Sequence, residues 1–219
     1  MKRITTLLLA LGILVTVSTT AVAQLTEEMK QDGWIAIFDG TTLEGWKANE
    51  PGSTGGFKVE NGAIVGFGNK NHLYFMEKFQ NFELKIDVKI NKNGNAGVYV
   101  KSQWQDNAWP TTGYELQVNS SHGDPQKTGT LYNIVKILKA PHEDDEWFTY
   151  HIISKKNTLE VSVNGNILYI YVDPMEGVPQ GENITEQNKR ISQSGHIALQ
   201  QHDPGSIPQF KNIFVKKLP

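Results

Sequence analysis

The segment Phe82–Ile90 alternates strictly between apolar and charged residues, and this pattern constrains the fold more than any other in the chain. Five apolar residues occupy every second position, and Glu83, Lys85, Asp87 and Lys89 fill the positions between them. Because successive side chains of a β-strand point to opposite faces, the segment predicts a strand that covers a core on one face and meets water on the other.

Seven further segments have the composition of strands. They are Gly97–Gln103, Tyr114–Asn119, Phe148–Ser154, Leu159–Val163, Ile167–Tyr171, His196–His202 and Phe210–Leu218. The dipeptides Asn164-Gly165 and Asn61-Gly62 predict tight hairpins, because both central residues of such a turn need positive φ. Many short strands at this spacing indicate an all-β protein, folded as a two-sheet antiparallel sandwich or jelly roll.

One short N-terminal helix is expected over Leu25–Gln31, with Thr26 as its cap and two acids in the first turn. No repeat or shift in composition divides the remaining sequence, so residues 25–219 are expected to form one domain. The absence of cysteine excludes disulfides, a cysteine nucleophile and thiolate metal sites. The near balance of 21 basic and 23 acidic residues argues against a nucleic-acid partner.

Residues 1–23 have the three parts of a secretory signal peptide. Lys2 and Arg3 give a positive start, Ile4–Val17 is apolar, and Ala21-Val22-Ala23 forms a small-x-small exit. The apolar stretch is shorter than the ~20 residues that a membrane span needs, so no stable span is expected. The sequence therefore predicts cleavage after Ala23 and a periplasmic or secreted protein.

Three predicted strands carry polar residues on the face that points away from the core. Alternation places Glu115 and Gln117 together, Gln200 with His202, and Tyr99 with Lys101. Singly, such residues are typical of solvated strand positions. On adjacent strands, however, they would form one face with an acid, a base, amides and an aromatic ring, which suits sugar hydroxyls and sugar C–H faces.

Several familiar catalytic patterns are missing. Ordinary glycosidases need two carboxylates at the scissile bond. Glucanases of the jelly-roll type often place theirs two and four positions apart on one strand, but here Gln117 and Asn119 follow Glu115. The chain also lacks a Gly-x-Ser-x-Gly elbow, a phosphate loop and a His-Glu-x-x-His pair.

Eight motifs, in order over nearly all of residues 25–219, resemble those of the 3-keto-disaccharide hydrolase family. The matching segments are Gly33–Trp46, Asn95–Lys101, Gly113–Val118, Thr128–Tyr132, Glu146-Trp147, Val163–Gly165, Gly195–His202 and Phe210–Ile213. Lys101 and Lys211 stand where that family usually has arginine, and Asn119 replaces a frequent aspartate. Lysine keeps the charge of arginine but not its bidentate fork.

The resemblance implies a concanavalin A-like lectin/glucanase sandwich and an enzyme that cleaves 3-keto-glycosides. A ketone at C3 acidifies the C2 proton, so one base starts an elimination at C1, and water then adds to give net hydrolysis. Glu115 and His202 are the expected catalytic residues, and either one is a candidate base. No cofactor is firmly expected, although Glu115 and His202 are candidate ligands of a divalent cation.

The remaining site residues are expected to bind substrate. Gln117 and Gln200 would bind hydroxyls, Lys101 or Tyr132 would stabilise developing negative charge, and Tyr99 belongs to the same face. The expected partner is a 3-keto-glycoside, supplied by a sugar 3-dehydrogenase. A non-catalytic carbohydrate-binding module remains the alternative, whereas the absent carboxylate pair disfavours an ordinary glycoside hydrolase.

Overall fold

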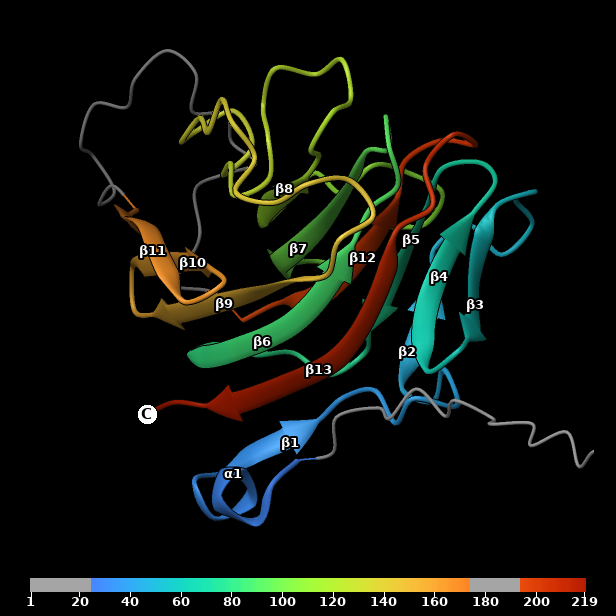
Figure 1. Ribbon diagram of the computed structural model, residues 1–219. Helices are drawn as coiled ribbons and strands as arrows, with labels where there is room; N and C mark the ends of the chain where they lie inside the picture. The colour runs from blue at the N-terminus through green and yellow to red at the C-terminus, as the bar shows by residue number, and fades with distance from the viewer. Residues whose placement is uncertain (1–24, 174–193) are drawn as a thin grey trace, which may run out of the picture.

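The computed structural model describes residues 25–173 and 194–219, and these form two antiparallel sheets (Figure 1). The predicted signal peptide lies outside the described residues. The larger sheet has the order β11-β10-β9-β6-β13-β4-β3, with β1 also paired to β13. Its strands are β1 (Trp34–Ala36), β3 (Gly56–Glu60), β4 (Ala63–Phe67), β6 (Phe82–Lys89), β9 (Phe148–Lys155), β10 (Thr158–Val163), β11 (Asn166–Val172) and β13 (Gln209–Lys217).

The smaller sheet has the order β2-β5-β12-β7-β8. Its strands are β2 (Trp46–Ala48), β5 (Asn71–Phe75), β7 (Ala96–Ser102), β8 (Tyr114–Val118) and β12 (His196–Gln201). Apolar side chains of both sheets fill one core between them, including Leu84 of β6, Val98 of β7 and Leu116 of β8, all fully buried. The predicted all-β sandwich is confirmed.

The local patterns have the expected structures. Residues of β6 alternate between buried and partly exposed, because its apolar face meets the core. Asn61-Gly62 and Asn164-Gly165 have positive φ at both positions and connect β3 to β4 and β10 to β11. The N-terminal helix α1 (Glu27–Gln31) begins after its cap, Thr26, whose Oγ1 accepts a hydrogen bond from the Met29 N–H at 3.1 Å.

Three strands were not predicted from the sequence. β1 and β2 have three residues each, which is too short for alternation to be recognised. β5 has four buried residues in succession, two of them the polar Asn71 and His72, so it shows no period of two. β5 pairs with β12, so the sequence prediction lacked one strand of the sheet that carries the candidate site.

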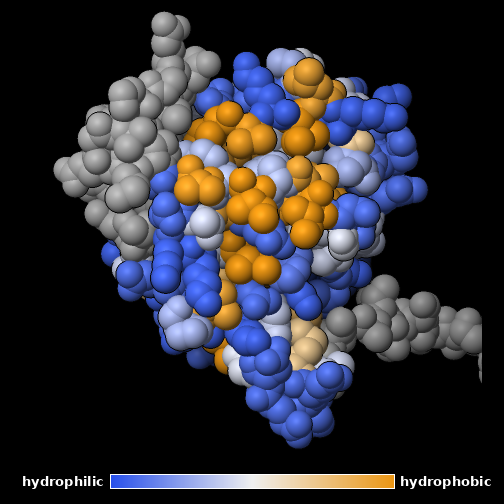
Figure 2. All heavy atoms as spheres, turned by 90° about the vertical axis from the view of Figure 1, so that its left-hand side faces the viewer, coloured by the Kyte–Doolittle hydropathy of each residue, from blue (hydrophilic) through white to orange (hydrophobic). Residues whose placement is uncertain are grey.

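The outermost strand of the larger sheet, β11, presents apolar side chains to solvent. Ile167, Ile170 and Val172 are each more than half exposed. Figure 2 faces this side of the molecule and shows apolar residues gathered there. Within the described residues, no helix has the length and apolar character that crossing a membrane requires.

Candidate active site

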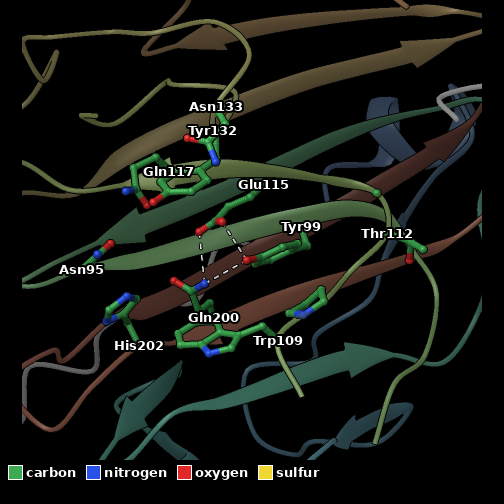
Figure 3. Close-up of a pocket in the computed structure, with 12 residues that line it drawn as sticks. Asn95, Tyr99, Trp109, Thr112, Glu115, Gln117, Tyr132, Asn133, Gln200 and His202 are labelled. Carbon is green, nitrogen blue, oxygen red and sulfur yellow. Dashed lines mark hydrogen bonds between the residues drawn. The ribbon is translucent and has the colours of Figure 1, made fainter. Parts of the chain in front are cut away.

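A cavity of about 300 Å³ lies on the face of the smaller sheet that points away from the core (Figure 3). Strands β7, β8 and β12 form its floor, and the loops that follow β7 and β8 form its walls. The lining residues are Asn95, Tyr99, Trp109, Pro110, Thr112, Gly113, Glu115, Gln117, Tyr132, Asn133, Gln200 and His202. Six of the seven site residues expected from the sequence are therefore together, and Lys101 is not among them.

The strand register brings the central residues into contact. Tyr99 on β7 lies directly opposite Glu115 on β8, and β12 pairs with the other edge of β7. The Tyr99 hydroxyl donates to Glu115 Oε2 at 2.7 Å, and Gln200 Nε2 donates to Glu115 Oε1 at 3.1 Å. Gln200 Nε2 also donates to the Tyr99 hydroxyl oxygen at 3.1 Å, so the three side chains form one network.

The environment of Glu115 raises the pKa of its carboxyl to about 7. Burial is the main cause, hydrogen bonds from Tyr99 and Gln200 act in the opposite direction, and the negative charge of Asp124 adds a smaller increase. A carboxyl with this pKa exchanges its proton readily near neutral pH. Gly97 leaves room for it, since a Cβ atom there would lie only 2.6 Å from Glu115 Oε1.

Amide groups without partners surround this network. Among the described residues, neither amide atom of Gln117 has a hydrogen-bond partner, nor do Gln200 Oε1 and Asn95 Oδ1. All these atoms are buried, and a buried polar atom without a partner is costly. Donors and acceptors left free in one cavity suit a ligand rich in hydroxyl groups.

His202 follows directly after β12 and is oriented by its neighbour Asp203. The carboxylate can only accept a hydrogen bond, so His202 Nδ1 donates to Asp203 Oδ2 at 2.8 Å. Asp203 also accepts hydrogen bonds from the Gly205 N–H at 2.8 Å and the Ser206 hydroxyl at 3.0 Å. These bonds outweigh the effect of burial and lower the pKa of Asp203. Because Nδ1 is used in this hydrogen bond, the other ring nitrogen of His202, Nε2, is the one available to exchange a proton with a ligand.

Tyr132 lies on the loop after β8. Its hydroxyl is 3.4 Å from Asp124 Oδ2, and its backbone N–H donates to the Glu115 carbonyl. Burial, followed by the charges of Asp124 and Glu115, raises the pKa of its hydroxyl, so Tyr132 stays protonated and remains a donor.

The structure corrects the placement of Lys101. Alternation predicted that its side chain shares the face of Tyr99, but β7 contains a β-bulge opposite β12, and Lys101 has a φ of 62°. Its side chain is buried, with Nζ 5.5 Å from the centroid of the Phe82 ring in the core. The bulge shifts the alternation by one residue, which turns Lys101 away from the cavity.

Asn119 also differs from the expected pattern. A period of two would place it on the face of Glu115 and Gln117, but it does not line the cavity. Its Nδ2 donates to the carbonyls of Asp124 and Gln126 at 3.0 Å each. Asn119 therefore shapes the wall loop that carries Asp124.

The sequence did not identify Trp109, Asp203 or His72. Trp109 lies in the loop between β7 and β8, and nothing in its flanking sequence predicts which way its side chain faces. His72 lies on the unpredicted β5, where its ring contacts Tyr99 and Trp109 with centroid distances of 5.5 and 5.3 Å. Burial lowers the pKa of His72 to about 3, so its ring is neutral.

No group of three or more His, Asp or Glu side chains in residues 25–173 and 194–219 is arranged to hold a metal ion. The candidate ligands Glu115 and His202 both line the cavity. Any cation held by these two would need further ligands from substrate or water.

Comparisons with known proteins relate this chain to one family and to several solved structures. The model of a family described as the 3-keto-alpha-glucoside-1,2-lyase-like domain matches residues 33–216. A curated protein from Bacteroides thetaiotaomicron, the 3-keto-disaccharide hydrolase, is 34% identical over 231 residues, covering 85% of this chain and 79% of that protein.

Solved structures show the same fold. A provisionally assigned glycosyl hydrolase from Parabacteroides distasonis superposes with a TM-score of 0.77 at 27% identity, covering 91% of this chain and all of that one. The Bacillus licheniformis β-glucanase gives a TM-score of 0.57 at 12% identity, covering 85% and 99% of the two chains, which shows similarity of fold alone.

Proposed function

The chain belongs to the 3-keto-alpha-glucoside-1,2-lyase-like family of carbohydrate-active enzymes, and on this premise we propose that it cleaves 3-keto-glycosides, including 3-keto-disaccharides, by elimination. The observation that carries the proposal is the number of carboxylates in the cavity. Among the described residues that line it, Glu115 is the only acid. Ordinary glycosidases need two carboxylates flanking the scissile bond, whereas elimination next to a ketone needs one base and one proton donor.

One base and one proton donor are sufficient for the elimination. The base takes the proton from C2, and the electron pair of the C2–H bond forms an enolate with the ketone at C3. The enolate then re-forms the ketone, a C1–C2 double bond appears, and the C1–O bond breaks as its oxygen takes a proton. Water adds to C1 while C2 regains a proton, so the net reaction is hydrolysis.

Glu115 is the base in this proposal. Its ionised carboxylate accepts hydrogen bonds from Tyr99 and Gln200 and still has a free lone pair for the C2 proton. The pKa of about 7 makes it a stronger base than an exposed carboxylate, while leaving much of it ionised at neutral pH.

His202 is the proton donor for the leaving oxygen. Its hydrogen bond from Nδ1 to Asp203 fixes the orientation of the ring and leaves Nε2 as the atom that gives a proton to a group bound in the cavity. Gln117 has two free amide hydrogens and is the candidate donor to the enolate oxygen, a role that the buried Lys101 does not fill. Gln200 and Asn95 would accept hydrogen bonds from sugar hydroxyls.

The proposal is tested with 3-keto-glucosides and the corresponding plain glucosides. Release of the leaving group from the keto form alone supports it, and deuterium at C2 should slow turnover or exchange with solvent. Release from plain glucosides would instead mean an ordinary glycoside hydrolase. Saturable binding without turnover would mean a carbohydrate-binding module.

The two roles are separated by the leaving group. Glu115→Gln should abolish both cleavage and C2 exchange for every substrate, because no base remains. His202→Ala should abolish cleavage of 3-keto-disaccharides but retain much of the activity on nitrophenyl 3-keto-glucosides, whose leaving group needs no proton. The reverse pattern would exchange the two assignments. Glu44→Gln, at an exposed position, is the control.

A divalent cation between Glu115 and His202 is a separate hypothesis. If it is right, exhaustive chelation should abolish turnover and an added divalent cation should restore it. Full activity after chelation would overturn it. A sugar 3-dehydrogenase is the proposed functional partner, because oxidation of the C3 hydroxyl is the reaction that makes the substrate.

A further inference from the structure

Trp109 is an aromatic side chain whose ring is partly exposed at the cavity. It lines the cavity and remains 43% exposed, although large aromatic rings are usually well buried. In Figure 3 it lies across the network of Glu115, Tyr99 and Gln200 from Tyr132. An exposed aromatic face beside free amides is suited to stacking on a sugar or aryl ring.

Other side chains hold the indole ring in place. His72 packs against it edge-on with a centroid distance of 5.3 Å, and His202 packs at 5.2 Å. Lys70 Nζ lies 5.3 Å from the ring centroid and is itself paired with Glu50. Because that ion pair is locally neutral, the surroundings of Trp109 favour an uncharged ring rather than an anion.

The loop that carries Trp109 is fastened by one buried side chain, Asn49. Its side-chain Nδ2 donates to the backbone carbonyls of Gln105 at 3.1 Å and Ala108 at 2.9 Å. The backbone carbonyl of Asn49 accepts a hydrogen bond from the Asn107 N–H at 3.0 Å. Asn49 Oδ1 accepts from the backbone N–H of His72 at 2.9 Å. The loop is thus joined to β5, which reduces the entropy lost when Trp109 binds a ligand.

The two ends of the site differ in depth. The Glu115 carboxyl is desolvated at the floor, so the sugar ring whose C2 proton it takes must reach the floor. Trp109 is exposed and lies beside His202, the proton donor to the leaving oxygen. We propose that Trp109 is the platform for the ring of the leaving group, and that this protein selects 3-keto-glycosides whose leaving group is a sugar or aryl ring. This inference rests on the proposed function.

The test compares methyl, phenyl and glucosyl 3-keto-glucosides as substrates of the full-length protein. Trp109→Ala should lower kcat/KM about tenfold for the phenyl and glucosyl compounds, as expected for one lost stacking contact, mainly through KM. The methyl compound should change less than twofold. Trp109→Phe should restore most of the loss. Trp147→Ala is the control, because it removes an equal ring from the outer face of the other sheet, beside Lys89 and Lys211. It should leave kcat/KM for all three substrates unchanged.

Two results would overturn the inference. An equal loss on all three substrates would assign Trp109 to the keto-sugar ring, and no loss would remove it from binding. A second assay does not depend on turnover: binding of plain phenyl and methyl glucosides is measured by NMR titration. Wild type should prefer the phenyl compound and Trp109→Ala should not. If the wild type cleaves no 3-keto-glycoside but shows this preference, the proposed function fails while the platform stands. No preference in the wild type overturns the platform.

Discussion

The hydroxyl of Tyr99 lies 2.7 Å from Oε2 of Glu115, across the pair of strands β7 and β8 where the two residues are directly opposite each other. Burial, and then the charge of Glu115, raise the pKa of Tyr99 far above its usual range, so its hydroxyl keeps its proton and donates. The bond favours the ionised form of a carboxyl that burial would otherwise neutralise. Tyr99 therefore tunes the proposed base.

Replacing Tyr99 by Phe should shift the pH dependence of kcat/KM. Loss of a donor to the ionised carboxylate raises the pKa of Glu115 further above about 7, by about one unit for a hydrogen bond to a charged group. Since the base must be ionised, the acid limb of the profile should move to higher pH, and activity should recover at pH 9. Tyr132→Phe is the control, because that hydroxyl bonds Asp124. An unshifted limb would contradict the role given to Tyr99.

Glu115→Gln should change how stability depends on pH. The carboxyl has a pKa of about 7 in the folded protein against 4.5 for the model group, so the folded state binds more protons between these values. The contribution of Glu115 to wild-type stability should therefore fall as pH rises from about 4.5 to about 7, and the difference between the two proteins separates it from that of other titrating groups such as His72. Between pH 4 and pH 8, the free energy of unfolding of the Gln variant should increase relative to that of the wild type by up to about 3 kcal/mol. Thermal midpoints of both proteins measure this. Glu44→Gln should show no such gain.

Asp203→Asn should weaken catalysis through His202. An Asn side chain can present its amide hydrogens to His202 Nδ1, which disfavours the orientation and tautomer in which Nδ1 carries the hydrogen. Turnover of 3-keto-disaccharides should fall at least tenfold, and that of nitrophenyl 3-keto-glucosides much less. Equal losses on both substrates would mean that Asp203 acts only by shaping the turn to Ser206.

Asn49→Asp should reproduce part of the Trp109 defect. The carboxylate cannot donate to the carbonyls of Gln105 and Ala108, so the loop is released from its position beside β5. We expect a loss of about 1–3 kcal/mol of stability, typical of buried groups left without partners. KM should rise for phenyl and glucosyl 3-keto-glucosides but not for the methyl compound. A uniform change in all three would contradict the proposed link.

Export is tested by the N-terminus of the mature protein. When the full chain is expressed in a bacterium with a secretion system, the exported form should begin at Gln24, after cleavage behind Ala23. Edman sequencing or mass spectrometry reads this directly. Replacing Ala21 and Ala23 by Leu should block processing, and an uncleaved exported protein from the native chain would contradict the prediction.

Prediction from the sequence succeeded where side-chain direction depends on local period alone. Glu115 and Gln117 share a face because they are two residues apart on β8, and Gln200 on β12 and His202 directly after it have the same spacing. Asn164-Gly165 turns tightly because its own backbone preferences allow it. The same rule failed for Lys101, because a bulge set by pairing with β12 interrupts the period.

The sequence by itself therefore determined the fold class, the hairpins and the polar face, since strand alternation and turn chemistry act over a few residues. Only the tertiary structure decided what lies around that face. Asn49 reaches a loop 56 positions away, and His72 joins the site through a strand with no alternation. Contacts between segments far apart in the chain depend on how both sheets close over one core, and no local pattern encodes that.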